Sequence, residues 1–206
     1  MLLILAALKL LPFADSELRQ GRFHINALRP VSRELQGLTV GYVGMGRIAQ
    51  AVARRLRAFG TNGIFFDPVV DSVEGLQRGS FQQVLRSADV VTLHLPLTAE
   101  TRYLISAAEL AQMKKGAYLI NTSRGGLIDE SALVQALEQG HLAAAALDVF
   151  ETEPMPLGHP LSRLNNVVLT PHIAAGTRDA LHTKMQSLFA NVQRFYRGEP
   201  LQNRVF

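Results

Sequence analysis

An arginine, a glutamate and a histidine follow successive apolar runs, and together they suit proton transfer beside a bound anion. Arg124 precedes two glycines, Glu153 precedes a proline, and His172 follows one. Imidazole titrates near neutral pH, a neighbouring carboxylate favours its protonated form, and a guanidinium can hold a carboxylate with two hydrogen bonds. Each residue alone has a plainer explanation, a surface loop for Arg124 and Glu153 and a structural side chain for His172. Their joint occurrence after strand-like runs favours the chemical interpretation.

A glycine-rich segment has the composition of a dinucleotide-binding turn. The apolar run before it leads into Gly44-Met-Gly46-Arg-Ile-Ala49 and then into helical spacing. Gly44 permits a tight turn, Gly46 lets a pyrophosphate approach the backbone, and the small Ala49 allows close helix–strand packing. The first N–H groups of the helix would face the phosphates. The two glycines alone could form a simple turn, but the strand-turn-helix order favours a dinucleotide.

Asp67 ends the second strand-like run, about 20 residues after Gly46, which is the interval of the dinucleotide fingerprint. A carboxylate there accepts hydrogen bonds from a ribose 2′-hydroxyl and repels a 2′-phosphate. No Lys or Arg follows Asp67 in the sequence until Arg78, so we expect NAD rather than NADP. The plainer alternative for Asp67 is an ordinary turn before Pro68.

These residues need a scaffold of alternating strands and helices, and the sequence predicts one. Apolar runs recur at similar intervals, with helical apolar spacing between the early ones. Such alternation is typical of a parallel sheet with helices on both faces, which makes the fold class α/β, a Rossmann-type doubly wound sheet. Ala143–Ala146 has a helix-favouring composition and is predicted as a strand only from its place in the alternation. The predicted strands are Leu38–Val43, Ile64–Asp67, Asp89–Leu95, Ala117–Asn121, Ala143–Val149 and Asn166–Thr170.

Two helices and an N-terminal arm complete the prediction. Asp129 caps a helix that stops at Gly140, and a long amphipathic helix runs from Thr177 to Arg197. Residues 1–36 form a helical arm, in which a buried helix is followed by a polar stretch, and residues 37–206 form an NAD-binding domain with its C-terminal helix. Met1–Leu11 is apolar, but it lacks a basic N-terminal region and is too short to span a bilayer.

Composition narrows the class of protein. The 206 residues are 48% hydrophobic and 18% charged, which is enough for one large domain with a substantial core. The chain has no cysteine, which excludes disulfides and cysteine-bound metal and fits a reducing cytoplasm; we expect no metal. The net charge of +4 is spread along the chain, and its one tight basic group, Arg54, Arg55 and Arg57, is interpreted as a solvated helix face. We expect neither a nucleic-acid nor a membrane partner.

Several longer motifs resemble the D-isomer-specific 2-hydroxyacid dehydrogenases. The resemblance runs from about residue 5 to the C-terminus. It implies NAD-dependent interconversion of 2-hydroxy acids and 2-oxo acids, in which Arg124 binds the substrate carboxylate, Glu153 orients His172, and His172 transfers the proton. The motifs are the glycine turn, Asp67, His94-Leu-Pro-Leu-Thr-Ala-Glu-Thr101, Asn121-Thr-Ser-Arg-Gly-Gly, Leu147-Asp-Val-Phe-Glu-Thr-Glu-Pro and Thr170-Pro-His-Ile.

The resemblance also implies cofactor contacts and an assembly state. Asp148 would position the nicotinamide carboxamide, although a strand-end cap is its plainer role. Thr101, which could instead cap a helix, would contact the pyrophosphate together with Arg47 and Ile48. The members of this family dimerise through the region that matches the arm, so we expect a homodimer. Three further residues would line the dinucleotide groove: Pro96, Thr122 and Ala175.

Departures from the family pattern keep a second hypothesis open. The family has a substrate-binding domain ahead of the NAD-binding domain, and we expect this sequence to hold almost none of it. A catalytically silent NAD-binding or dimerising module is therefore the alternative, and relatives that act as corepressors keep the same three residues. Formate dehydrogenase is disfavoured, because the pattern of that enzyme has Gln at the position that Glu153 occupies in this sequence. Glyoxylate, hydroxypyruvate, phosphoglycerate and lactate are not separated as substrates. Ala49 and Ala174-Ala175-Gly176 are smaller departures.

Overall fold

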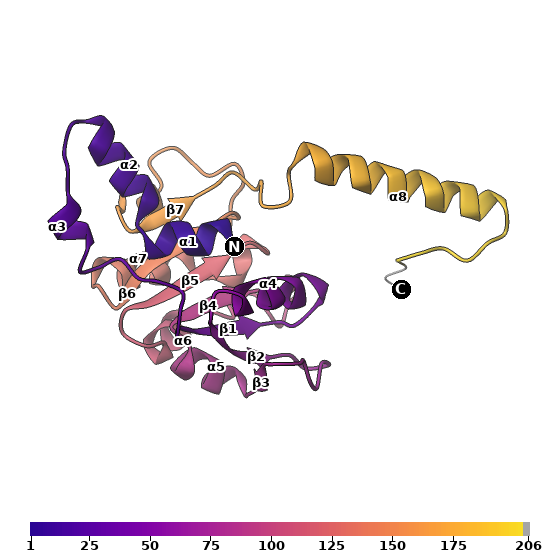
Figure 1. The fold of residues 1–206 in the computed structure, drawn as a ribbon, viewed down its shortest axis with the longest axis horizontal. Coiled ribbons are helices and arrows are strands. Elements are labelled where there is room, and N and C mark those ends of the chain that lie inside the picture. Colours follow the sequence, from indigo (N-terminus) through magenta and orange to yellow (C-terminus); the bar gives the residue numbers. More distant parts are fainter. Residues whose placement is uncertain (204–206) are drawn as a thin grey trace. The chain divides into compact units, whose positions relative to one another are not determined.

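The computed structural model describes residues 1–203 and divides into two compact units, one formed by residues 1–171 and one that begins at His172. The first unit contains a seven-stranded sheet with the order β3-β2-β1-β4-β5-β6-β7 (Figure 1), in which every paired strand is parallel to its neighbour. The strands are β1 (Thr39–Val43), β2 (Asn62–Phe66), β3 (Gln77–Arg78), β4 (Val90–Leu93), β5 (Ala117–Asn121), β6 (Leu142–Leu147) and β7 (Val167–Leu169).

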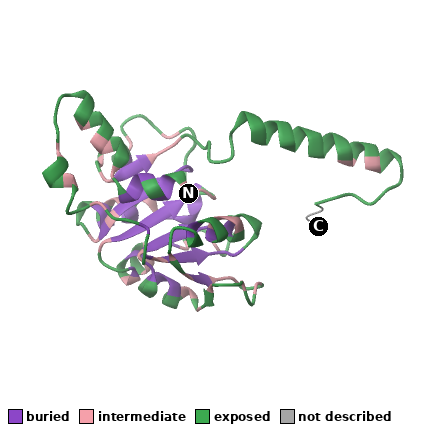
Figure 2. Ribbon diagram, in the orientation of Figure 1, coloured by how far each residue is buried: buried purple, intermediate pink, exposed green. Residues whose placement is uncertain are grey.

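Helices cover both faces of this sheet, and each face has its own apolar cluster. One cluster joins α1 and α4 to the sheet, and the other joins α5, α6 and α7 to it. Figure 2 shows the buried strands between more exposed helices. The helices are α1 (Leu2–Leu8), α2 (Leu11–Arg19), α3 (Ile25–Leu28), α4 (Arg47–Arg57), α5 (Phe81–Ser87), α6 (Ala107–Gln112) and α7 (Glu130–Glu138), with the short 3₁₀ helices η1 (Gly125–Leu127) and η2 (Pro160–Arg163).

The continuous apolar strands follow from burial on both faces. Successive side chains of a strand point to opposite faces. In β1, Val40 and Tyr42 join the cluster under α1 and α4, whereas Val43 joins the cluster under α5 to α7. A strand that is buried on both sides needs apolar residues at every position, so its pattern is a run rather than an alternation. The predicted doubly wound α/β fold is confirmed, and the alanine-rich β6 is a strand.

Some elements differ from the prediction. Most of the predicted strands extend a residue or two beyond the observed ones, as is usual for element boundaries. The edge strand β3 was missed because both of its residues are exposed and carry no apolar pattern. The helix α5 was also missed, and α6 was anticipated only as a helix that Thr101 could cap. Each of them begins with a capping box, Ser80 with Gln83 and Ser106 with Glu109. Such S-x-x-Q and S-x-x-E signals could have located both helices.

The N-terminal segment is more helical than predicted. The predicted buried helix is confirmed as α1, which packs on β5, β6 and β7 with Leu3, Ile4 and Leu8 buried. The stretch after it was predicted only as a polar part of the arm. It forms α2 and α3, neither of which has a buried residue. Residues 1–203 contain no helix that is long and apolar enough to cross a membrane. The predicted domain boundary at residue 36 stays a prediction.

The second unit contains α8 (Arg178–Tyr196), which matches the predicted C-terminal helix. The Thr177 hydroxyl caps it by accepting a hydrogen bond of 3.0 Å from the backbone N–H of Ala180. The helix ends at Arg197, and Gly198 follows with a φ of +69°. Five of its apolar side chains are spaced so that they share one face of the helix, and all of them are exposed: Leu181, Met185, Leu188, Val192 and Phe195.

Candidate active site

The carboxyl ends of the strands bring most of the predicted residues of the first unit to one edge of the sheet. Gly44, Asp67, Arg124 and Asp148 follow β1, β2, β5 and β6 respectively. Because all the strands are parallel, their carboxyl ends lie at the same edge. The strand order reverses direction at the boundary between the neighbouring strands β1 and β4. Ligands of doubly wound folds bind outside the carboxyl ends of the strands at such a switch point.

The turn after β1 accepts only glycine at its first position. Gly44 has a φ of +88°, and a Cβ there would lie 2.5 Å from the carbonyl oxygen of His94, which follows β4. The Gly44 N–H donates a hydrogen bond of 2.8 Å to the carbonyl of Phe66, the last residue of β2. The turn therefore lies against the ends of both neighbouring strands. Any larger residue would displace backbone, which is costly in a close-packed region.

The start of α4 has the features of a phosphate site. Gly46 is the N-cap and, as a glycine, offers no side chain to cap the helix. A Cβ at Gly46 would meet nothing within 4 Å, so the space beside it is open. Arg47 and Ile48 are exposed, whereas Ala49 is fully buried. The first-turn N–H groups and the positive end of the helix dipole fit an anionic pyrophosphate.

Asp67 is already held by backbone donors. Its Oδ2 accepts a hydrogen bond of 2.7 Å from the Met45 N–H, and its Oδ1 accepts bonds of 2.8 and 2.9 Å from the N–H groups of Val69 and Val70. Burial alone would raise the pKa of Asp67, but these hydrogen bonds and the charge of Arg78 outweigh burial and hold the pKa below its ordinary value. Asp67 is thus a carboxylate that also shapes the glycine turn.

A cation does lie beside Asp67, although the sequence places it well downstream. Arg78, on β3, donates a hydrogen bond of 3.3 Å from Nη2 to the backbone carbonyl of Asp67. The same guanidinium forms an ion pair of 2.7 Å with the exposed Asp71. The pairing of β2 with β3 brings Arg78 to this position. The prediction of NAD over NADP rested partly on the absence of a nearby cation, which does not hold in three dimensions. The Asp67 carboxylate is the remaining basis of that prediction.

The turn that carries Arg124 is tied to β4 through buried polar groups. Asn121, which is fully buried, donates from Nδ2 to the Arg124 carbonyl at 2.9 Å and accepts from the Ser123 N–H at 3.0 Å. The Ser123 hydroxyl donates to the carbonyl of Leu93 at 2.7 Å. The Arg124 side chain is exposed and donates from Nη1 to the Ser123 carbonyl at 2.6 Å. Asn121 and Ser123 lie in a motif that the sequence singled out, but their positioning role was not predicted.

The Arg124 turn packs directly on the loop that carries Glu153. A Cβ at Gly125 would lie 1.9 Å from the carbonyl carbon of Phe150, so the two backbones touch. Glu153 Oε1 accepts a hydrogen bond of 3.0 Å from the Phe150 N–H. The structure therefore brings the loops of Arg124 and Glu153 together, and Phe150 is the residue that both loops contact.

Asp148 and Thr101 have local partners of their own. Asp148 is only 1% exposed and its Oδ1 accepts a hydrogen bond of 2.5 Å from the hydroxyl of Thr170. The Thr101 hydroxyl donates to the carbonyl of Pro96 at 2.8 Å and accepts from the Thr98 N–H at 2.7 Å. Thr101 thus closes a turn that begins at Pro96, and Ser106 rather than Thr101 caps α6. The contacts predicted for these residues with a cofactor stay predictions.

The remaining predicted residues divide between the two units. Thr122 is half-buried after β5, and Pro96 is exposed after β4. His172 and Ala175 belong to the second unit, and their roles stay predictions. His172 has a φ of +54°, a left-handed conformation that only a few per cent of non-glycine residues adopt. Such outliers occur preferentially at functional sites.

His94 is a further polar residue at this edge to which the sequence assigned no role. Its Nε2 lies 3.0 Å from the Thr92 hydroxyl, and its ring stacks on Tyr42 with 6.4 Å between the ring centroids. Burial lowers the pKa of His94 to about 4, so the imidazole is neutral at physiological pH. Its carbonyl lies against Gly44. The structure therefore gives His94, the first residue of one of the longer motifs, a packing role against Tyr42 and the glycine turn.

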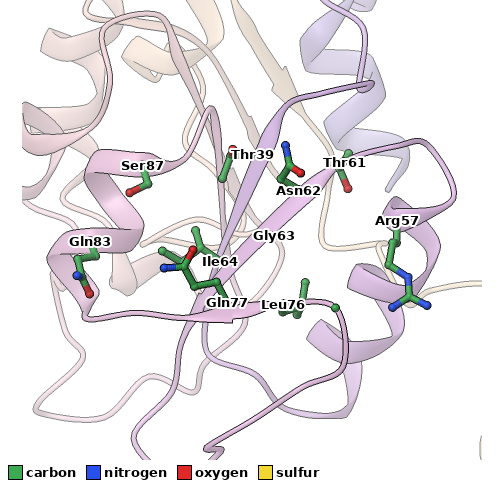
Figure 3. Close-up of a pocket in the computed structure, with 11 residues that line it drawn as sticks. Thr39, Arg57, Thr61, Asn62, Gly63, Ile64, Leu76, Gln77, Gln83 and Ser87 are labelled. Atoms are coloured by element: carbon green, nitrogen blue, oxygen red, sulfur yellow. The ribbon is translucent and has the colours of Figure 1, made fainter.

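A cavity of about 660 Å³ lies away from all these residues (Figure 3). It opens at the amino ends of β1 and β2, whereas the predicted site lies at their carboxyl ends. None of the predicted site residues lines it. Among residues 1–203, no group of three or more His, Asp or Glu side chains could hold a metal ion. The cavity is lined by Thr39, Arg57, Thr61, Asn62, Gly63, Ile64, Gly75, Leu76, Gln77, Gln83 and Ser87.

Comparison with known proteins places these features in one family. Residues 1–174 match the family described as "D-isomer specific 2-hydroxyacid dehydrogenase, NAD binding domain". A D-3-phosphoglycerate dehydrogenase of Methanocaldococcus jannaschii is 40% identical over 98% of this chain and 39% of its own length. A glyoxylate reductase of Thermofilum pendens is 41% identical over 96% of this chain and 60% of its own.

Solved structures agree with this match. The crystal structure of a glyoxylate reductase from Paecilomyes thermophila superposes with a TM-score of 0.87 at 37% identity, and it covers 94% of this chain and 59% of that one. The chain therefore spans between about two fifths and three fifths of the length of these three relatives.

Proposed function

Because this chain belongs to the D-isomer specific 2-hydroxyacid dehydrogenases, as their NAD-binding domain, we propose that it supplies the cofactor site and the catalytic residues of an enzyme that interconverts 2-hydroxy acids and 2-oxo acids. One observation carries the proposal. The Arg124 turn packs through Gly125 on the loop of Glu153, at the same sheet edge as the glycine turn. A cation and a carboxylate at the sheet edge of the predicted dinucleotide site support the proposal, because such a reaction needs this arrangement.

The chain holds the cofactor with backbone groups and one carboxylate. The first-turn N–H groups of α4 bind the pyrophosphate over the open space beside Gly46, with Arg47 and Ile48 at its edge. Asp67 accepts from the adenosine ribose, since a carboxylate has about four acceptor positions and three backbone donors leave one of them. When bound, NAD would supply the hydride chemistry. Asp148 orients the nicotinamide end, and Pro96, Thr101, Thr122 and Ala175 line the groove.

The three catalytic residues bind the substrate, transfer the proton and orient the proton donor. Arg124 holds the carboxylate of the 2-oxo acid and polarises its carbonyl, a task that suits a rigid guanidinium fork. His172 gives a proton to the carbonyl oxygen during reduction and takes it back during oxidation. Glu153 orients the imidazole and favours its protonated form. The exposed position of Arg124 and the left-handed backbone of His172 support these assignments.

The second candidate function is a catalytically silent NAD-binding module that dimerises. Exposed apolar side chains on α2, α3 and the segment between them support a homodimer through the arm: Leu11, Leu18, Phe23 and Ile25. Light scattering of Phe23→Asp, with Leu157→Asp at a fully exposed position as control, tests this interface. A cytoplasmic location is an expectation from the cysteine-free composition.

A binding measurement and an activity assay test the proposed function. Calorimetry with NADH measures binding, and NADH oxidation with glyoxylate and with hydroxypyruvate measures turnover. We expect His172→Ala and Arg124→Ala to lower turnover by about a hundredfold or more while NADH still binds. Arg86→Ala, on an exposed face of α5, is the matched control. Binding without turnover in the unaltered chain would favour the silent module, and the absence of NADH binding would refute both functions.

A further inference from the structure

The loop that carries Glu153 is anchored by a carboxylate from α7. Glu130 is the first residue of that helix and follows its N-cap, Asp129. Asp129 Oδ1 accepts hydrogen bonds of 3.0 and 3.1 Å from the N–H groups of Ser131 and Ala132, so the start of the helix is well defined. This cap fixes the direction in which the Glu130 side chain leaves the helix.

Glu130 uses one oxygen for each end of the loop. Its Oε1 accepts a hydrogen bond of 2.8 Å from the backbone N–H of Glu151, near the start of the loop. Its Oε2 lies 3.2 Å from Nε2 of His159, at the end of the loop. The side chains of Glu130 and His159 are only 12% and 18% exposed. A carboxylate this sheltered interacts more strongly than one on the open surface.

The orientation of His159 follows from its second nitrogen. Nδ1 accepts a hydrogen bond of 3.3 Å from the Leu161 N–H, at the start of η2. An imidazole that accepts at Nδ1 carries its proton at Nε2 when it is neutral. That N–H faces the Glu130 carboxylate. His159 therefore links η2 to α7 without needing a positive charge.

The peptide held by Glu130 is the one on which both candidate catalytic loops rest. The Glu151 N–H, which donates its hydrogen bond to Glu130, belongs to the peptide bond after Phe150. Gly125, next to Arg124, packs on the carbonyl of that same bond. The Phe150 N–H donates to the carboxylate of Glu153. A shift of this peptide would therefore move Glu153 and the Arg124 turn together.

We propose that Glu130 and His159 are positioning residues that hold Glu153 and the Arg124 turn in their reactive geometry. The inference rests on the proposed function, because positioning matters only if those residues act on a substrate. Neither Glu130 nor His159 touches the reacting atoms. They act through the Phe150–Glu151 peptide, as partners that orient the residues doing chemistry.

A helix-stabilising role for Glu130 makes a different prediction. A negative charge in the first turn stabilises a helix through the dipole, and Glu130→Gln and Glu130→Ala both remove that charge. Only Glu130→Gln keeps a carbonyl oxygen that can accept from the Glu151 N–H. A positioning role therefore predicts a small effect of Glu130→Gln on the loop and a large effect of Glu130→Ala. Stabilisation of the helix through its dipole predicts equal effects of the two variants.

The test combines amide hydrogen exchange at Phe150 and Glu151 with NADH oxidation. For Glu130→Ala we expect exchange at both amides to accelerate about tenfold or more, and kcat to fall about ten- to a hundredfold, with the NADH Kd unchanged. Glu130→Gln is expected to keep most of the protection. Glu138→Ala, an exposed glutamate at the other end of α7, is the matched control and is expected to change neither measurement.

Each outcome separates the two proposals. Unchanged exchange at Phe150 in Glu130→Ala, or equal effects of the Gln and Ala variants, would overturn the positioning role. Exchange is measured without substrate, so it decides this point even if the unaltered chain has no turnover, which would count against the proposed function alone. His159→Ala keeps the bond from Glu130 to Glu151 and serves if Glu130→Ala does not fold. It is expected to accelerate exchange about threefold; no change would remove His159 from the proposal.

Discussion

Two ends of the same sheet edge are built in different ways. The dinucleotide end, defined by Gly44, Gly46 and Asp67, comes from one strand-turn-helix-strand segment, and its groups are mostly backbone. The reacting end, defined by the loops of Arg124 and Glu153, comes from segments that follow different strands and depends on side-chain anchors between them. The first end can be recognised from contiguous sequence. The second depends on how loops pack, which makes it more sensitive to single contacts.

The largest effect should come from the contact between the two loops of the reacting end. Gly125→Ala would place a methyl group 1.9 Å from the carbonyl carbon of Phe150, and backbone on both sides would have to move. We expect the free energy of unfolding to fall by about 3 kcal/mol. Urea denaturation followed by circular dichroism measures this.

Gly46→Ala is the matched change at the dinucleotide end. Nothing lies within 4 Å of a Cβ there, so we expect stability to change by less than about 0.5 kcal/mol. NADH binding should weaken instead, because the methyl group occupies the space that we assign to the pyrophosphate. Equal losses of stability in the two variants would show that the two ends do not differ as described.

A second comparison concerns acid sensitivity at the dinucleotide end. The pKa of His94 is lowered by burial from its ordinary 6.5 to about 4, so the unfolded chain binds this proton more readily than the folded chain. The stability that neutral His94 provides is complete above pH 6.5 and is lost as the pH falls through about 4. We expect the unaltered chain to lose about 2 kcal/mol more than His94→Gln between pH 7.5 and 4.5.

Urea unfolding at several pH values measures that difference. His182→Gln, which alters an exposed histidine of α8, is the control and should retain the acid sensitivity of the unaltered chain. If His94→Gln loses as much stability as the unaltered chain, another group is responsible for it.

The smallest effect should come from the Asp67 carboxylate, which shapes the glycine turn and which we propose as the acceptor for the ribose. We expect Asp67→Ala to weaken NADH binding about tenfold, or about 1.4 kcal/mol, because the ribose loses an acceptor and Met45 N–H loses its partner. NADPH should lose less, since Arg78 remains and the repulsion of a 2′-phosphate is removed. Calorimetry with both cofactors gives the ratio.

Asp71→Ala provides the control for the Asp67 variant. Asp71 is an exposed carboxylate that also pairs with Arg78, but it does not contact the glycine turn. Its removal should leave the NADH affinity nearly unchanged. An equal loss of affinity in both variants would mean that net charge, rather than the position of Asp67, determines cofactor binding.

Local signals accounted for most of the scaffold and for one end of the site. The apolar runs, the turn at Gly44 and the caps of α4, α7 and α8 each depend on residues within a few positions of one another. Such patterns are visible without knowledge of the fold. The edge strand β3 was missed for the same reason, since it buries neither of its residues and has no periodic signal.

The sequence by itself determined the alternation of strands and helices, the glycine turn and the identity of the acid that follows it, because backbone geometry and periodic burial are short-range properties. Only the tertiary structure decided that Arg78 lies beside Asp67, that Gly125 packs under Phe150, and that Glu130 anchors the loop of Glu153. Those contacts join residues on different strands and helices. They depend on strand order and register, which many apolar side chains determine jointly and no single motif records.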